Sequence, residues 1–236
     1  MEKKLEDTFM RRISVKQLSI CLFLWLSLFS YPYAVLASEE VGTESELNWV
    51  LKNIKQTELR LKTFSAKMVQ IRKTRLLKSP LQSEGLIYFD SEGKMLFKIT
   101  TPSPLLVLFK DGMVVLNYPD LGKVEKRYIG RNILKEFLGI GQSIEALRKR
   151  FSIHLVSKTP SDSYRLRLVP KREIMGKYFD SIEVMVNRNR WLPERIDFQE
   201  KDGDWASTQL EFTSINEPLP SKVFDMHFPN NFEDDQ

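Results

Sequence analysis

In Tyr164-Arg165-Leu166-Arg167-Leu168, apolar and basic residues alternate with a period of two. Successive side chains of a β-strand point to opposite faces of a sheet, so this segment has one apolar and one hydrated face. The same alternation returns at 182–186, 196–199 and 210–212. The pattern predicts an antiparallel sheet that is apolar on one side.

More strands are expected on both sides of this segment, because short apolar runs are separated by turn residues such as Glu92-Gly93, Asp111-Gly112 and Asp202-Gly203. These runs predict about ten strands in all. The predicted strands cover residues 65–72, 85–90, 95–100, 105–109, 113–118, 153–157, 164–170, 181–187, 194–200 and 207–215.

Three helices are predicted between and before these strands. Thr43 and Glu46 have the spacing of a capping box, and apolar residues follow at helical intervals, so a first helix is expected over 45–62. Shorter helices are expected at 131–138 and at 143–151, where Ser143 is a suitable N-cap. So few helices leave much apolar sheet, which favours a curved sheet with its concave face partly filled by helices.

The phase of two strands predicts which side chains point inward. Lys98 and Asn117 occupy one phase, so the apolar residues of the other phase are expected on the concave face. These residues are Met95, Phe97, Ile99, Val114, Leu116 and Tyr118. Each of them alone also fits an ordinary core position, so the prediction of a cavity concerns the set.

The composition is that of an ordinary globular protein with little material for catalysis. The 236 residues include 36 Lys and Arg, 31 Asp and Glu, one Cys and two His. One cysteine excludes a disulfide framework and a thiolate zinc site, and two histidines leave little for acid–base or metal chemistry. We therefore expect no enzyme, no catalytic residue, no metal and no cofactor.

The N-terminal segment has the pattern of a signal peptide. Lys and Arg residues up to Lys16 precede an uncharged run over 18–30, and Val35-Leu36-Ala37 precedes Ser38. We expect cleavage after Ala37, with residues 1–37 removed and residues 38–236 forming a single domain. An uncleaved anchor over 18–37 is the alternative, and it also places the domain outside the cytoplasm.

A series of short motifs runs along nearly the whole remaining chain. They are Phe64, Ala66, Met68 and Gln70, then Gly85-Leu86-Ile87-Tyr88-Phe89, Lys94, Met95 and Phe97, Pro102, Leu106-Val107, Asp111-Gly112, Leu116, Tyr118 and Pro119, Leu166, Leu168 and Pro170, Leu192-Pro193, Asn216, Phe224, Phe228 and Pro229. No single motif is specific, but their order and spacing together are. In these motifs the chain resembles one family, the periplasmic outer-membrane lipoprotein carriers of the LolA type.

This resemblance implies an incomplete antiparallel β-barrel, a curved half-barrel sheet closed by about three short helices. Its cavity would shield the acyl chains of lipoproteins between the inner and outer membranes. The implied partners are acylated lipoproteins, an inner-membrane ABC exporter and an outer-membrane acceptor; we expect a periplasmic monomer that binds no nucleic acid. The residues expected to line the cavity are Phe64, Met68, Leu86, Tyr88, Met95, Phe97, Ile99, Val107, Val114, Leu116, Tyr118, Leu166, Val184 and Phe198.

One position departs from the family pattern. Well-known members carry an Arg-Pro pair after the strand that begins at Gly85, and the arginine holds the helical lid closed. Here Ser91 stands at that place, with Lys94 nearby in a turn. The role of the arginine is therefore not carried over to any residue of this chain.

Several other functions remain as alternatives. A carrier or sensor of another acyl lipid would use the same sheet. An esterase would need an activated nucleophile, and His154 could pair with Ser152 or Ser157, but the sequence has no G-x-S-x-G turn. We expect His154 to be a half-buried polar residue on a strand, and His227 also fits an ordinary structural position. Basic runs at 148–150 and 171–172 suggest nucleic-acid binding, but such runs are usually hydrated surface.

Overall fold

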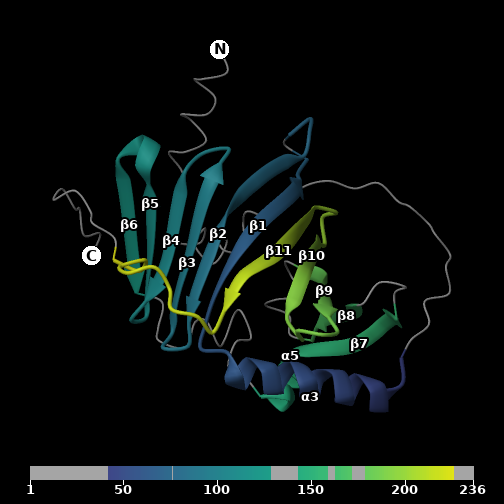
Figure 1. The fold of residues 1–236 in the computed structure, drawn as a ribbon. Coiled ribbons are helices and arrows are strands. Elements are labelled where there is room, and N and C mark those ends of the chain that lie inside the picture. The colour runs from purple at the N-terminus through teal and green to yellow at the C-terminus, as the bar shows by residue number, and fades with distance from the viewer. Residues whose placement is uncertain (1–41, 76, 129–142, 159–162, 172–178, 226–236) are drawn as a thin grey trace.

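The computed structural model describes residues 42–75, 77–128, 143–158, 163–171 and 179–225, shown in colour in Figure 1. Several sequence-based predictions lie outside these residues. They are the signal peptide over 1–37, the helix over 131–138 and the position of His227.

One sheet of eleven antiparallel strands dominates the described structure. Its strand order is β6-β5-β4-β3-β2-β1-β11-β10-β9-β8-β7. The strands are β1 (Thr63–Lys73), β2 (Leu81–Asp90), β3 (Lys94–Thr101), β4 (Leu105–Lys110), β5 (Met113–Tyr118), β6 (Lys123–Tyr128), β7 (Phe151–Lys158), β8 (Ser163–Pro170), β9 (Phe179–Asn187), β10 (Pro193–Glu200) and β11 (Trp205–Ile215).

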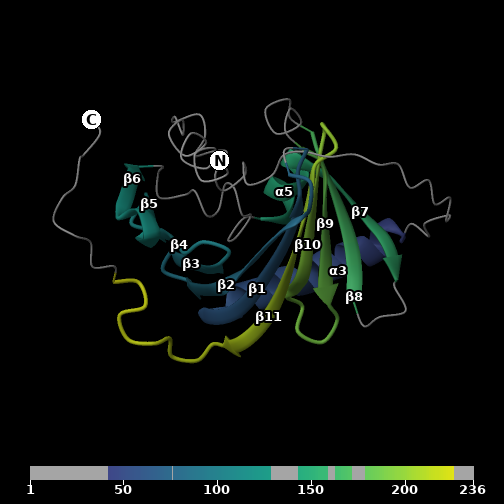
Figure 2. The ribbon, with the colours of Figure 1, turned by 90° about the horizontal axis from the view of Figure 1, so that it is seen from above.

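The first and last strands of the chain meet in the middle of this sheet. β1 pairs with β2 on one side and with β11 on the other, so that Met68 lies between Gly85 and Leu210. This pairing joins one meander of strands β1–β6 to a second of strands β7–β11. Seen from above, the sheet is curved, and β6 and β7 lie far apart at its two edges (Figure 2). The sheet is therefore not closed into a barrel.

All ten predicted strands are present, and an eleventh was missed. The missed strand, β6, is an edge strand paired only with β5. Its sequence, Lys-Val-Glu-Lys-Arg-Tyr, lacks an apolar alternation because charged residues occupy both phases. Charged edge strands are common since they discourage pairing with other chains.

The first helix, α3 (Glu44–Arg60), begins at the predicted capping box. The Thr43 hydroxyl accepts a hydrogen bond from the Glu46 amide at 3.2 Å, and the Glu46 carboxylate accepts one from the Thr43 amide at 3.3 Å. The first helix predicted over 45–62 is thus confirmed. It is 17 residues long and extends over almost five turns, so the description of the helices as short does not fit α3. No helix in the described ranges is long and apolar enough to cross a membrane.

The second described helix, α5 (Ile144–Arg150), follows the predicted N-cap Ser143, whose hydroxyl accepts a hydrogen bond from the Ala146 amide. A single 3₁₀ turn, η2 (Pro119–Leu121), connects β5 to β6. The basic run at the end of α5 joins the two helices, because Arg148 contacts Glu44 at 2.7 Å and Asn48 at 2.9 Å.

Candidate functional site

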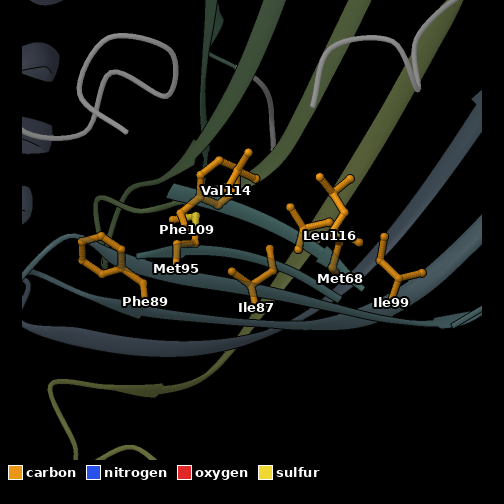
Figure 3. Packing of buried hydrophobic residues seen from close by; sticks show 9 residues of the cluster. Met68, Ile87, Phe89, Met95, Ile99, Phe109, Val114 and Leu116 are labelled. Carbon is orange, nitrogen blue, oxygen red and sulfur yellow. The ribbon is translucent and has the colours of Figure 1, made fainter. Parts of the chain in front are cut away.

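A continuous group of apolar side chains covers one face of strands β1–β5. Nine of its members are buried, and Figure 3 shows the labelled side chains projecting from the same side of the sheet. They are Met68, Ile87, Phe89, Met95, Ile99, Val107, Phe109, Val114 and Leu116. We call this set the β1–β5 apolar cluster.

The pairing of the strands explains how these residues come together. Across the sheet, Phe97 stands opposite Ile87 on one side and Val107 on the other, and Val107 stands opposite Leu116. The period of two then repeats the same face along each strand. Aromatic rings add edge contacts, since Phe97 and Phe109 meet edge to face with centroids 6.2 Å apart.

A second apolar cluster lies on the same face of the sheet, at the β7 end. Residues that stand directly opposite each other on neighbouring strands point to the same face. Such pairs lead from Gln70 on β1 through Thr208, Ile196, Val184 and Leu166 to Leu155 on β7. Here α3 packs its buried residues Leu47, Val50 and Leu51 onto the strands, and Ile144 and Leu147 of α5 join them.

The two clusters differ in what covers them. Within the described part of the chain, the part-buried apolar partners of the β1–β5 apolar cluster come from the strands themselves, apart from Leu61. Leu61 is the residue that ends α3. Neither described helix therefore packs its apolar face on β1–β5, whereas both pack at the β7 end.

Twelve of the fourteen residues predicted to line a cavity lie on this face. Six are buried in the β1–β5 apolar cluster, and three more pack against it while remaining partly exposed. The last three lie further along the same face, two of them in the cluster covered by α3 and α5. The six buried residues are Met68, Met95, Ile99, Val107, Val114 and Leu116, and the three partly exposed ones are Phe64, Phe97 and Tyr118. Leu166 and Val184 belong to the cluster covered by α3 and α5, and Phe198 lies beside them on β10.

The other two, Leu86 and Tyr88, lie on the opposite face, so their predicted placement is wrong. Leu86 pairs with Lys67 and Lys98, both of which belong to the opposite phase. Tyr88 packs instead on an outer cluster of Leu96, Leu108 and Val115, together with Val223 and Phe224. The run 85–89 is apolar almost throughout, so its sequence does not specify which phase faces inward.

For the same reason the sequence analysis missed three members of the β1–β5 apolar cluster. Ile87, Phe89 and Phe109 are buried on the inner face but were not predicted to line it. The alternation around Lys98 fixes the phase of β3, and pairing β3 with β2 and β4 would have identified all three. The necessary signal was present in the neighbouring strand and not in their own.

Asn216 connects the end of the sheet to the end of α3. Its side-chain oxygen accepts a hydrogen bond from the Lys62 amide at 2.7 Å, and its side-chain amide donates one to the Arg60 carbonyl at 3.1 Å. Its backbone amide donates to the Thr63 carbonyl at 2.8 Å. With a φ of 59°, Asn216 occupies the left-handed region, which asparagine tolerates better than most residues. These hydrogen bonds hold the segment between α3 and β1 against the end of β11.

Ser91 and Lys94 take part in the β2–β3 turn and in its link to the residues after α3. The Ser91 amide donates a hydrogen bond to the Lys62 carbonyl at 2.7 Å. Lys94 lies 2.6 Å from a Glu92 carboxylate oxygen and 3.8 Å from one of Asp90, and the hydrogen bond with Glu92 raises the lysine pKa. Its ionic partners are thus the acids of its own turn.

His154 does not belong to a catalytic arrangement in the described structure. It is exposed on β7 opposite Arg167, in the phase that points away from the apolar face. The expectation that it is half-buried is therefore wrong. A hollow of about 260 Å³ near residues 219–225 is also separate from the β1–β5 apolar cluster, because charged residues such as Lys94, Lys110 and Asp225 line it.

Comparisons with solved structures give matches of low identity. An outer membrane lipoprotein-sorting protein domain from Vibrio parahaemolyticus is 16% identical, with a TM-score of 0.42 over 75% of this chain and 95% of that one. Lipoprotein LppX of Mycobacterium tuberculosis is 10% identical, with a TM-score of 0.46 over 75% and 99% of the two chains.

The complex of Pseudomonas aeruginosa MucA and MucB gives a further match at 12% identity and a TM-score of 0.46, covering 77% of this chain and 61% of that one. No curated protein matches the chain. The family model described as outer membrane lipoprotein carrier protein LolA matches residues 60–227, which is well over half of the sequence. The chain therefore belongs to the LolA family.

Proposed function

We propose that this protein is a periplasmic carrier that shields the acyl chains of lipoproteins on the inner face of β1–β5 and transfers them from the inner to the outer membrane. The observation that carries this proposal is the β1–β5 apolar cluster, onto which neither described helix packs its apolar face. Membership of the LolA family supports the same class of cargo.

The energetics of an acyl chain explain why such a face is needed. Leaving a methylene in water costs about 0.8 kcal/mol, so a chain of about sixteen carbons costs on the order of 12 kcal/mol when exposed. A carrier must offset most of this cost with apolar surface of its own. Non-directional contacts with Met, Phe, Leu and Ile side chains are suited to a flexible chain.

The opposite face of the β7–β11 half is suited to contact with water. Arg167 and Arg165 lie 3.0 and 3.7 Å from the two carboxylate oxygens of Glu183 in the neighbouring strand. Lys67 and Glu211 form a similar pair across β1 and β11 at 3.3 Å. A lipid is therefore expected on the inner face only.

The remaining parts of the proposal follow from the carrier function. Residues 1–37 serve as the export signal, and residues 38–236 form one domain that acts as a monomer. Cargo is received from an inner-membrane ABC exporter and delivered to an outer-membrane acceptor. The chain needs no catalytic residue or cofactor, because loading and release are binding steps.

Native mass spectrometry of the protein purified without detergent from a bacterial periplasm tests whether it carries a lipid. We expect a bound acylated species that is released on denaturation. A released lipoprotein supports the carrier function proposed here, while a released free lipid would support a carrier or sensor of another acyl lipid. A wholly unliganded mass from several hosts would contradict both.

A matched pair of variants tests which face binds the lipid. Phe97 and Tyr88 are both part-buried aromatic residues, on neighbouring strands but on opposite faces. Phe97→Asp places a charge under the acyl chain and should abolish lipid binding, whereas Tyr88→Asp should retain it. Arg167→Ser should also retain binding. Equal loss of lipid in folded Phe97→Asp and Tyr88→Asp proteins would show that the faces are assigned wrongly.

A further inference from the structure

Three carboxylates converge at the hairpin between β10 and β11. Glu200 ends β10, Asp202 lies in the turn and Asp204 directly precedes β11. One carboxylate oxygen from each lies within 4.8 Å of the others. The turn itself is held by hydrogen bonds from the Glu200 amide to the Asp204 carbonyl at 2.8 Å and from the Gly203 amide to the Glu200 carbonyl at 3.1 Å.

Two of these carboxylates are buried and have oxygens without a hydrogen-bond partner in the described structure. The Asp204 side chain has no exposed surface, and neither of its carboxylate oxygens has a partner in the described structure. Glu200 is 8% exposed, and its Oε1 lacks a partner as well. A buried carboxylate without a donor is costly, and such groups in a native protein usually indicate a bound ion or water.

The nearby arginines do not hydrogen-bond Glu200 Oε1 or either carboxylate oxygen of Asp204 in the described structure. Arg72 on β1 and Arg75 favour the charged carboxylates, and Arg75 donates to the main-chain carbonyl of Asp202. Burial nevertheless outweighs them, since it raises the pKa of Glu200 to about 8 and that of Asp204 to about 7; the Asp202 charge adds to both effects. Further positive charge at this point would stabilise the ionised carboxylates.

We propose that Glu200, Asp202 and Asp204 bind a divalent cation of the calcium type. Calcium takes oxygen ligands at 2.3–2.6 Å, so two ligands of one ion lie at most about 5 Å apart, which accommodates the separations here. Magnesium demands a near-ideal octahedron at 2.0–2.1 Å and usually keeps several waters, so a set of three protein carboxylates suits calcium better. An all-oxygen set without histidine or cysteine also suits a hard cation.

The structural role of such an ion follows from its position. It would hold together the β10–β11 turn, which lies at the end of the β1–β11 pairing that joins the two halves of the sheet. Sites of this kind in extracellular modules bind calcium with a dissociation constant of about 0.1–1 mM. At 5 mM Ca²⁺ the ratio of folded to unfolded protein should therefore rise about 6- to 50-fold.

Terbium luminescence and thermal unfolding test the site directly. Trp205 follows Asp204 in the chain and can sensitise the emission of bound Tb³⁺, which Ca²⁺ should then displace. At pH 8, 5 mM Ca²⁺ should raise the melting temperature of the chelator-treated protein, and Mg²⁺ should raise it less. Isothermal titration calorimetry should give one Ca²⁺ per chain.

Asp204→Asn and Glu200→Gln should abolish both the terbium emission and the calcium-dependent stabilisation. Both changes remove a buried charge, so both variants should remain folded. Glu211→Gln, an exposed change on the same hairpin, serves as the matched control and should keep both signals. The proposal is overturned if wild-type protein shows no calcium shift at pH 8, if Asp204→Asn retains the full shift, or if Mg²⁺ raises the melting temperature as much as Ca²⁺ does.

Discussion

Raising the pH from 5.5 to 8 in the presence of a chelator should destabilise the protein markedly. Burial raises the pKa of Glu200 from 4.5 to about 8 in the folded state. The folded state therefore binds more protons than the unfolded state between these values, and stability falls as the pH rises through this window. The stabilisation is complete only below about pH 4.5, where Glu200 is protonated in both states.

The size of the effect follows from the two pKa values. Each unit of difference is worth about 1.4 kcal/mol, and the shift of Glu200 alone gives a loss of about 3 kcal/mol between pH 5.5 and pH 8. For a chain of this length that corresponds to a fall in melting temperature of about 6–12 °C. The raised pKa of Asp204 acts in the same direction, but the two acids interact and their effects do not add.

Differential scanning calorimetry at several pH values would measure this slope. Glu200→Gln mimics the protonated side chain, so this variant should be more stable than the wild-type protein at pH 8 and should depend less on pH. Glu211→Gln, an exposed substitution, should keep the wild-type slope. A wild-type melting temperature that does not fall between pH 5.5 and 8, or an equal fall in Glu200→Gln, would refute the reasoning.

Two further predictions concern single residues of the sheet. Asn216→Ala removes two side-chain hydrogen bonds and places alanine at a φ of 59°, which alanine tolerates less well than asparagine, so urea unfolding should show a loss of about 2–4 kcal/mol in the free energy of unfolding. Asn216→Gly should lose less, because glycine adopts this φ without strain; equal losses in the two variants would show that the backbone conformation is unimportant. Gly85→Ala would place a Cβ 2.4 Å from the Lys98 carbonyl oxygen and should cost about 1–3 kcal/mol; unchanged stability would contradict this close approach.

Local patterns in the sequence predict most of the sheet but not its order. The alternation at 164–168 and the turn residues at 111–112 and 202–203 specify strands and hairpins, because both depend on neighbouring residues only. The pairing of β1 with β11 depends on residues far apart in the chain, and no local pattern indicates it. The missed β6 has too few apolar residues to be recognised without its partner β5.

For the candidate site, too, the sequence predicts what depends on neighbouring residues and misses what depends on the fold. Phe97 and Leu116 lie on the inner face, as the phase of Lys98 and Asn117 in their strands predicts. Leu86 and Tyr88 were misplaced because both faces of this half are apolar, one in the inner cluster and one beneath Val223 and Phe224. The acidic residues of the β10–β11 turn were visible in the sequence, but only the structure shows that Asp204 is completely buried.

The central position of β1 has a consequence for how the protein folds. Gln70 and Thr208, which form a hydrogen bond across the pairing of β1 and β11, are 138 positions apart in the chain. Contacts of such high sequence separation form slowly, because the entropy of closing the intervening loop is lost first. The first meander can form from local contacts, whereas the strand pairing that joins the second meander to it waits for β11. A newly synthesised chain therefore exposes its apolar strands until β11 is in place, and partly folded states of this kind are prone to aggregate.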